Sequence, residues 1–285
     1  MDVTGNNALF SRLTAVIESM PAFKESVHQV ISMTSNINCA PKELVRVIES
    51  DPVMTMKLLK LVNSAFFALS RNISSIKHAL VYLGLNTVKN LAISVAAVDS
   101  LPRQSIKELP VSSFLTHSIA TALISQRLAK NFLHIKDASD YFVAGLVHDF
   151  GKAVLIQFEP KTYAEVLREA KEKQCPLIQI EVEKIGVSNT EVGAMLAESW
   201  QLPKSLVDSI RSFASCDETS SDLTLVVAAA NIVAKHMGLG DGSNPCTGEL
   251  PEFICQRLGS DLESLVQQMG GLQDEIQAMK GMVQG

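Results

Sequence analysis

The chain has 285 residues, which is long enough for one large domain or two ordinary ones. Hydrophobic residues make up 47% of it and charged residues 19%, and this composition argues against global disorder. The formal charge of −5 comes without a dense Lys/Arg block, which argues against nucleic acid as a partner, and the longest apolar runs (91–98 and 223–234) fall short of the ~20 residues that cross a membrane.

Helical periodicity dominates the first hundred residues. Asp51 before Pro52 is a start signal, because Asp caps free backbone N–H groups and Pro is tolerated in the first turn. Gly84 can end a helix by adopting a positive φ, and Asn86 is expected to cap the next one. Apolar residues recur at three- and four-residue spacings, which predicts helices that begin at residue 41 and that cover 53–67, 76–83 and 87–98.

Prolines at 102 and 110 interrupt the middle of the chain and indicate a boundary, because proline disfavours a continuous helix. We therefore expect an N-terminal helical subdomain over 1–105 and a second helical subdomain, with a C-terminal helix, over 106–285. Strand signals are nearly absent, so the predicted fold class is all-α. Beyond the boundary the pattern predicts a polar, Gly-rich loop at 238–250 and helices at 112–130, 138–158, 161–173, 177–184, 189–199, 203–213, 221–237 and 261–282.

The residues with the clearest chemistry are His148 and Asp149, in the second subdomain. An imidazole next to a carboxylate offers nitrogen and oxygen ligands to a divalent cation. Neighbouring residues on a helix point about 100° apart, so other elements must close around such a pair, and His117 on the preceding helix is a candidate. By itself this evidence is weak, because a histidine or a His-Asp pair is more often a hydrogen-bonded structural feature.

Longer patterns make the assignment specific. GLVHDFGK at 145–152 resembles the GLLHDIGK signature of the HD superfamily of metal-dependent phosphohydrolases. IESDPVMTMKLLKLVNSA at 48–65, ISSIKHALVYLG at 73–84, and VGAML with WQLP at 192–203 resemble successive patterns of the HDOD family, the HD-related output domains. These matches keep the family's order between about residues 20 and 237. The resemblance implies an N-terminal helical bundle packed on an HD-like helical half.

The resemblance also implies a set of metal ligands. The HD site takes a first His, the His-Asp pair and a final Asp, and the corresponding residues here are His117, His148, Asp149 and Asn231. The amide of Asn231 offers a neutral oxygen but no negative charge to offset the ion. Lys152, at the end of the signature, is a candidate phosphate contact, although a Lys near a helix end also suits the helix dipole.

Further ligands of the two-metal relatives are missing as well. Where the family often has a His after Gly186, this chain has Asn189. Where relatives have a His pair after the WQLP segment, this chain has Phe213 and Ala214. The sequence therefore predicts at most a single divalent ion.

Two hypotheses about function follow from this depleted site. One is a non-catalytic signal-transduction or scaffolding module that needs no cofactor and contacts regulatory proteins. The alternative is a metal-dependent phosphohydrolase or phosphodiesterase that acts on a nucleotide. A hydrolase needs a metal-activated water and enough ligands to hold the ion with one position open. Because ligands are missing, we expect the non-catalytic module; the depleted site favours a chain that is not an enzyme and leaves the catalytic alternative open.

Candidate contact surfaces are less well defined. The segment 78–90 has the outline of a helix–turn–helix, but Lys89 is the only base of its second helix, so DNA binding is the weakest hypothesis. Asn63, Ser64 and Phe66–Phe67 form a candidate surface for protein partners. Asn63 is equally suited to cap a helix, and we expect the two Phe side chains in the core.

The expected location is the cytoplasm. The five cysteines form neither a CxxC pair nor a regular framework, which is typical of free thiols in a reducing compartment. The N-terminus has no basic segment of the secretory type, so we expect neither export nor contact with a membrane. The oligomeric state has no signal in the sequence.

Overall fold

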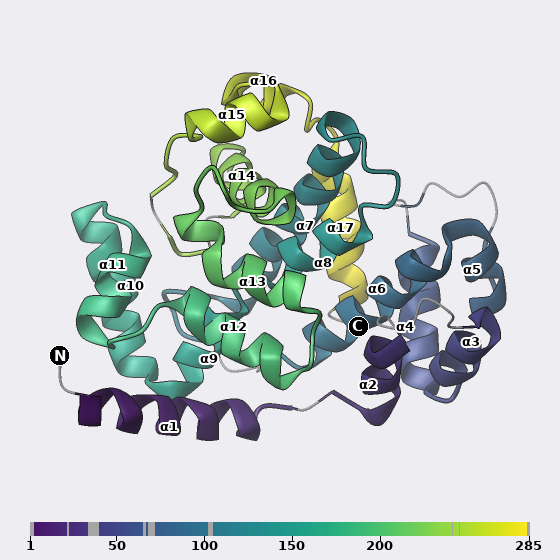
Figure 1. Cartoon of the computed structure of the whole chain (residues 1–285), viewed down its shortest axis with the longest axis horizontal. Coiled ribbons are helices and arrows are strands. Elements are labelled where there is room, and N and C mark those ends of the chain that lie inside the picture. The colour runs from purple at the N-terminus through teal and green to yellow at the C-terminus, as the bar shows by residue number, and fades with distance from the viewer. Residues whose placement is uncertain are drawn as a thin grey trace.

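The computed structural model is all-helical, as predicted (Figure 1). It describes residues 3–21, 23–33, 40–64, 67, 72–101, 105–240, 242–244 and 246–283. Within these ranges the only β-type pairing recorded is an isolated bridge between Ile106 and Leu109. None of the described helices combines the length and the apolar character needed to cross a bilayer.

The N-terminal bundle consists of short helices joined by tight turns. Helices α2 to α6 pack on one another, whereas α1 runs along one edge of the molecule and contacts α9 and α12 of the second half (Figure 1). The proposed division near residue 105 stays a prediction. The elements are α1 (Val3–Ser19), α2 (Glu25–Ser32), α3 (Pro41–Glu49), α4 (Pro52–Val62), α5 (Ile76–Leu83) and α6 (Leu85–Asp99).

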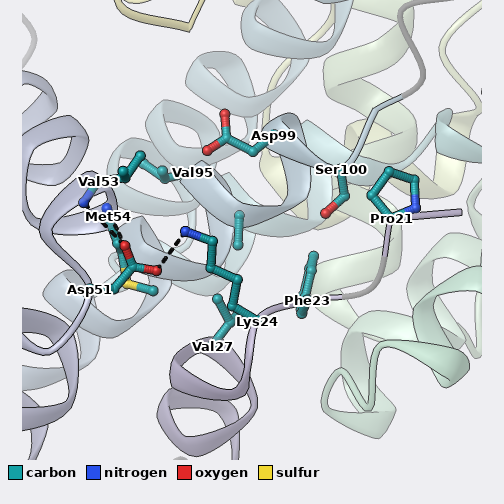
Figure 2. A pocket seen from close by; sticks show the side chains of 11 residues that line it. Pro21, Phe23, Lys24, Val27, Asp51, Val53, Met54, Val95, Asp99 and Ser100 are labelled. Carbon is teal, nitrogen blue, oxygen red and sulfur yellow. Dashed lines mark hydrogen bonds and ion pairs between the residues drawn. The ribbon is translucent and has the colours of Figure 1, made fainter.

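The start of α4 follows the predicted cap. The Asp51 carboxylate accepts hydrogen bonds from the backbone N–H groups of Val53 and Met54, both at 3.1 Å. Its other oxygen accepts from Lys24 Nζ at 3.0 Å, which ties α4 to the start of α2. Figure 2 shows this carboxylate between the two helices, at the edge of a cavity of about 180 Å³.

Two asparagines near helix ends, Asn86 and Asn63, have different structural roles. The prediction that Asn86 caps a helix is wrong, because α6 begins at Leu85 and its N-cap is Gly84 at φ +83°. Asn86 instead donates to Ser139 Oγ (3.1 Å) across the contact with the second half. Asn63 ends α4 and is a structural bridge, since its amide donates to Ile73 O (2.8 Å) and accepts from Ile73 N (2.7 Å).

Phe66 lies outside the described residues, and Phe67 is half-buried against the core.

The second half is built around α7, which contacts α8, α14 and α17. The N-terminal bundle packs on this half through α6 against α8 and through the stacked rings of Phe23 and Trp200, whose centroids are 4.5 Å apart. The elements are α7 (Val111–Phe132), α8 (Ser139–Val147), α9 (Phe150–Phe158), α10 (Pro160–Lys173), α11 (Leu177–Lys184), α12 (Asn189–Ser199), α13 (Lys204–Ser212) and α14 (Asp222–His236).

The single helix predicted over 138–158 is wrong, because α8 ends at Val147 and α9 begins at Phe150. The His148 ring donates from Nδ1 to Gly145 O at 2.8 Å, so a side chain satisfies a carbonyl at the end of α8. Asp149 then lies at the N-cap of α9 with φ −103° and ψ 5°. The break between α8 and α9 therefore coincides with the His-Asp pair.

The C-terminal region also differs from the prediction of one helix at 261–282. The helices here are α15 (Glu252–Leu258), α16 (Leu262–Gln267) and α17 (Leu272–Val283). Gly270 and Gly271 separate the last two, and Gly271 has φ +79°, which interrupts helical geometry. Helix α17 returns to contact α4, α6 and α7 and so joins the C-terminal region to both halves.

Candidate functional site

The candidate ligands come from three helices that pack closely. His117 lies in the second turn of α7, Asn231 lies on α14, and the His148-Asp149 pair lies between α8 and α9. Gly145 allows the approach of α8 to α7: a Cβ there would lie 2.7 Å from Thr121 O. The glycine of the signature therefore lets α8 pack closely on α7, the helix that contains His117.

The structure brings all four candidate ligands together. His117 Nε2 lies 3.7 Å from Asp149 Oδ2, and His148 Nε2 lies 3.4 Å from the same oxygen. Asn231 Oδ1 lies 3.1 Å from His117 Nε2. One ligand atom from each of His117, His148 and Asp149 falls within 4.8 Å of the others. Separations of roughly 3–3.6 Å are those that ligand atoms adopt around one ion with bonds of about 2.1 Å.

The hydrogen bonds of the two rings fix where their lone pairs point. His117 Nδ1 faces Gly240 O at 3.0 Å, and His148 Nδ1 faces Gly145 O at 2.8 Å. Because a carbonyl only accepts, His148 Nδ1 carries the hydrogen and His148 Nε2 carries a lone pair. His117 Nε2 faces a second acceptor, Asn231 Oδ1, at 3.1 Å, so its lone pair points to the shared centre in the tautomer that has its hydrogen on Nδ1. His148 Nε2 is buried without a hydrogen-bond partner. Acceptor atoms therefore converge on one point, and this arrangement fits a cation.

Lys152 supplies a positive charge at the edge of this group. Its Nζ donates to Asp149 Oδ2 (2.7 Å) and to Gly242 O (2.8 Å), and the residue is 2% exposed. The role of Lys152 as a phosphate contact stays a prediction.

A turn after α14 covers the site. We call residues 238–240 and 242–244 the cover segment. A Cβ at Gly242 would lie 2.7 Å from Asp149 Oδ2 and 2.9 Å from His117 Cδ2, so only glycine allows this approach. Gly240 and Gly242 have φ of +85° and +56°, a region that glycine occupies without strain. Beneath the segment, His117 and His148 have no exposed surface.

Burial sets the protonation of the group. Burial, assisted by the neighbouring His148 and opposed by Asp149, lowers the pKa of His117 to about 3. Burial also lowers the pKa of His148. For Asp149 burial favours the neutral form, but His148 and Lys152 outweigh it and lower the pKa of the carboxyl. The two imidazoles are therefore neutral and Asp149 is ionised at neutral pH.

These shifts predict a protein that loses stability in mild acid. A histidine whose pKa is lower in the folded than in the unfolded chain stabilises the fold above the unfolded pKa of about 6.5, and this stabilisation is lost as the pH falls. For His117 alone, lowering the pH from 7 to 5 is expected to reduce the free energy of unfolding by about 2 kcal/mol. Urea unfolding at both pH values in the presence of EDTA measures this. His117→Gln should weaken the dependence of the free energy of unfolding on pH, whereas the exposed control His236→Gln should keep it. Equal stability of the unmodified protein at both pH values would contradict the lowered pKa of His117.

Two missing histidines of the family pattern have defined replacements. Phe213 presents its ring edge to His148, with centroids 5.1 Å apart and planes at 78°. Asn189 Nδ2 donates to Glu181 Oε2 at 2.8 Å. Neither residue is part of the group of converging ligand atoms.

Glu181 is a buried residue that sequence reasoning did not single out. It has no exposed surface and accepts hydrogen bonds from Tyr163 Oη, Asn189 N and Asn189 Nδ2. Burial raises its pKa, although its donors oppose the shift. On a short amphipathic helix such a glutamate has the pattern of a surface residue, and its three donors come from 8 and 18 residues away.

Comparisons of this chain with known proteins agree on one protein family. A family model of the HDOD domain matches residues 20–215. An HDOD domain protein of unknown function from Geobacter sulfurreducens has a crystal structure that is 24% identical, with a TM-score of 0.75, over 95% of this chain and 98% of that one. A candidate phosphohydrolase from Shewanella amazonensis SB2B gives 22% identity and a TM-score of 0.75 over the same shares. At these identities the likeness establishes the fold alone.

Longer relatives also match. A candidate signal transduction protein from Marinobacter aquaeolei VT8 is 22% identical with a TM-score of 0.77, over 98% of this chain and 66% of that one. An uncharacterised protein from Treponema pallidum (strain Nichols) is 24% identical over 251 residues, which cover 85% of this chain and 47% of that protein. The matching region thus spans about half the length of this curated relative.

Proposed function

Because this chain belongs to the HDOD domain family, we propose that it is a non-catalytic signal-transduction module that acts in the cytoplasm through contacts with regulatory proteins. The observation that carries this proposal is the burial of the candidate centre. His117 and His148 have no exposed surface, Asp149 is 3% exposed and Lys152 is 2% exposed. A hydrolytic site needs a ligand position open to water and substrate. The cover segment occupies the approach to this one.

The converging ligands support a limited role for a metal. His117, His148 and Asp149 would hold one divalent ion, with the amide oxygen of Asn231 as a neutral fourth ligand. In an open site such an ion would lower the pKa of a bound water. In this chain the residues themselves exclude water and hold the α7, α8 and α14 helices together. We therefore infer that any bound ion stabilises the fold and that no cofactor is needed for function.

A phosphohydrolase acting on a nucleotide is the second candidate. The convergence of two imidazoles, one carboxylate and one ammonium favours it, because these groups are suited to a metal and to phosphate. It requires the cover segment to leave the site, and it has only one charged oxygen ligand to hold the ion.

Metal analysis combined with a hydrolysis assay separates the two candidates. Protein purified without chelators and then supplied with Mn²⁺, Fe²⁺, Ni²⁺, Mg²⁺ or Zn²⁺ should contain at most about one ion per chain, and His117→Ala should lose it. Nucleotides and cyclic dinucleotides should be hydrolysed no faster by the unmodified protein than by this variant. The exposed His78→Ala is the matched control, and melting curves verify that all three proteins are folded. Hydrolysis that disappears in His117→Ala but persists in His78→Ala would establish the phosphohydrolase instead.

A further inference from the structure

A second cavity lies on the outer side of the cover segment. It has a volume of about 420 Å³, within the range of small-molecule sites. The start of α7, the side of α10 and the cover segment surround it. Its polar lining comprises Lys107, Glu108, Ser113, Arg168, Lys171 and Ser243. We call it the α7–α10 pocket.

The charge of this pocket is opposite to that of the chain. Lys107, Arg168 and Lys171 face one lining carboxylate, that of Glu108, so the lining has a formal excess of two positive charges, whereas the chain as a whole carries −5. Arg168 Nε lies 3.5 Å from Glu108 Oε1. In the part of the chain that the structure describes, no ion pair is recorded for Lys107 or Lys171.

The other lining residues indicate which class of ligand would fit this pocket. The hydroxyl of Ser113 is able to donate to an anion, and Pro110 and Leu167 add an apolar part. Lysine and arginine give charge-assisted hydrogen bonds that suit phosphate oxygens. An apolar surface next to them suits the organic part of a phosphate ester better than a bare anion.

One lining residue joins the pocket to the buried centre. Ser243 has φ +57°, a left-handed conformation that costs energy for a residue with a Cβ, and its Oγ donates to Glu108 O at 2.6 Å. The preceding residue, Gly242, accepts from Lys152 Nζ through its carbonyl. Two consecutive residues of the cover segment therefore contact the pocket rim on one side and the Lys152–Asp149 pair on the other.

We propose that the α7–α10 pocket binds a small organic phosphate as an effector, at a site separate from the His117/His148/Asp149 group. The ligand's phosphate contacts Lys107, Arg168 and Lys171, and its body lies on Pro110 and Leu167. Because the cover segment forms part of the pocket, the bound ligand holds that segment closed. This site does not depend on whether the buried group contains an ion.

Titration calorimetry at low salt tests the proposal with four probes: GMP, AMP, glucose 6-phosphate and pyrophosphate. At least one organic phosphate should bind saturably at one site per chain, more tightly than pyrophosphate and equally with or without EDTA. In Lys107→Gln/Lys171→Gln its Kd should rise about tenfold or more, since each lost contact is a charge-assisted hydrogen bond. Hydrogen exchange of residues 242–244 should slow when the ligand binds.

The matched control uses a different basic pocket. Lys130 and Lys136 line a cavity with Tyr82 and Glu275 at the other end of α7, and Lys130→Gln/Lys136→Gln should leave the Kd within about twofold. The proposal is overturned if none of the four probes binds, or if both double variants weaken binding equally. Pyrophosphate binding as tightly as the organic phosphates would refute the assigned ligand class, and unchanged exchange at 242–244 would refute the link to the cover segment.

Discussion

Replacing Lys152 with Met is expected to lower the free energy of unfolding by about 3–5 kcal/mol, the usual cost of removing one partner from a buried ion pair. Asp149 is 3% exposed, and the Lys152 ammonium 2.7 Å away is the cation that compensates its charge. Methionine has a similar length and fills the same space, so the loss reports the missing charge and hydrogen bonds rather than a cavity. The Gly242 carbonyl loses its donor in the same variant.

Urea unfolding in the presence of EDTA measures this loss. Lys173→Met is the matched control, because Lys173 pairs with Glu169 on the exposed side of α10 and its replacement should leave the midpoint nearly unchanged. Adding Asp149→Asn to Lys152→Met should recover part of the lost stability by removing the uncompensated charge. Lys152→Met as stable as the unmodified protein would mean that Asp149 does not depend on this ammonium.

The substitution Gly151→Ala is expected to destabilise the fold by about 3 kcal/mol, at the upper end of the cost of overpacking. A Cβ at this position would lie 1.9 Å from Asn189 O and 2.6 Å from Gly193 N. Both atoms belong to the backbone of α12, so no side chain can rotate away, and α9 and α12 must move apart. The contact explains physically why a glycine follows the His-Asp pair by two residues.

Thermal and urea unfolding of Gly151→Ala should show the lower free energy of unfolding as a lower unfolding midpoint. Gly270→Ala is the matched control, since no atom lies within 4 Å of a Cβ there. A Gly151→Ala protein as stable as Gly270→Ala would show that α9 and α12 separate at little cost, and the close packing of these helices would have to be reconsidered.

The elements that sequence reasoning predicted well are those with local signals. Helices α5, α11 and α12 have the predicted bounds, and Asp51 caps α4 as expected. A cap depends on two or three neighbouring residues, and the apolar face of an amphipathic helix is visible in one stretch of chain. The break between α8 and α9 has no such signal, because it depends on the His148 ring taking the carbonyl of Gly145.

The candidate site likewise contains residues that the sequence indicates and contacts that it does not indicate. His117, His148 and Asp149 are visible through the family pattern, and the structure brings one potential ligand atom of each within 4.8 Å of the others. The Gly242 carbonyl on Lys152 and the donors around Glu181 are long-range contacts, and nothing in the residues around Gly242 or Glu181 indicates them. A glycine in a polar loop and a glutamate on an amphipathic helix are ordinary in isolation.

The bond from Lys152 to Gly242 also has a consequence for synthesis of the chain. Its two residues are 90 positions apart, so the HD signature leaves the ribosome well before its cover exists. Until residue 242 follows, Asp149 and Lys152 remain hydrated, and the neighbouring helices cannot close completely around them. A fragment limited to residues 20–215 lacks Asn231, Gly240 and Gly242, so its site would stay incomplete. Its two histidines and its ion pair would be open to water. Without α14 and α17, α7 would expose an apolar face to chaperones and proteases.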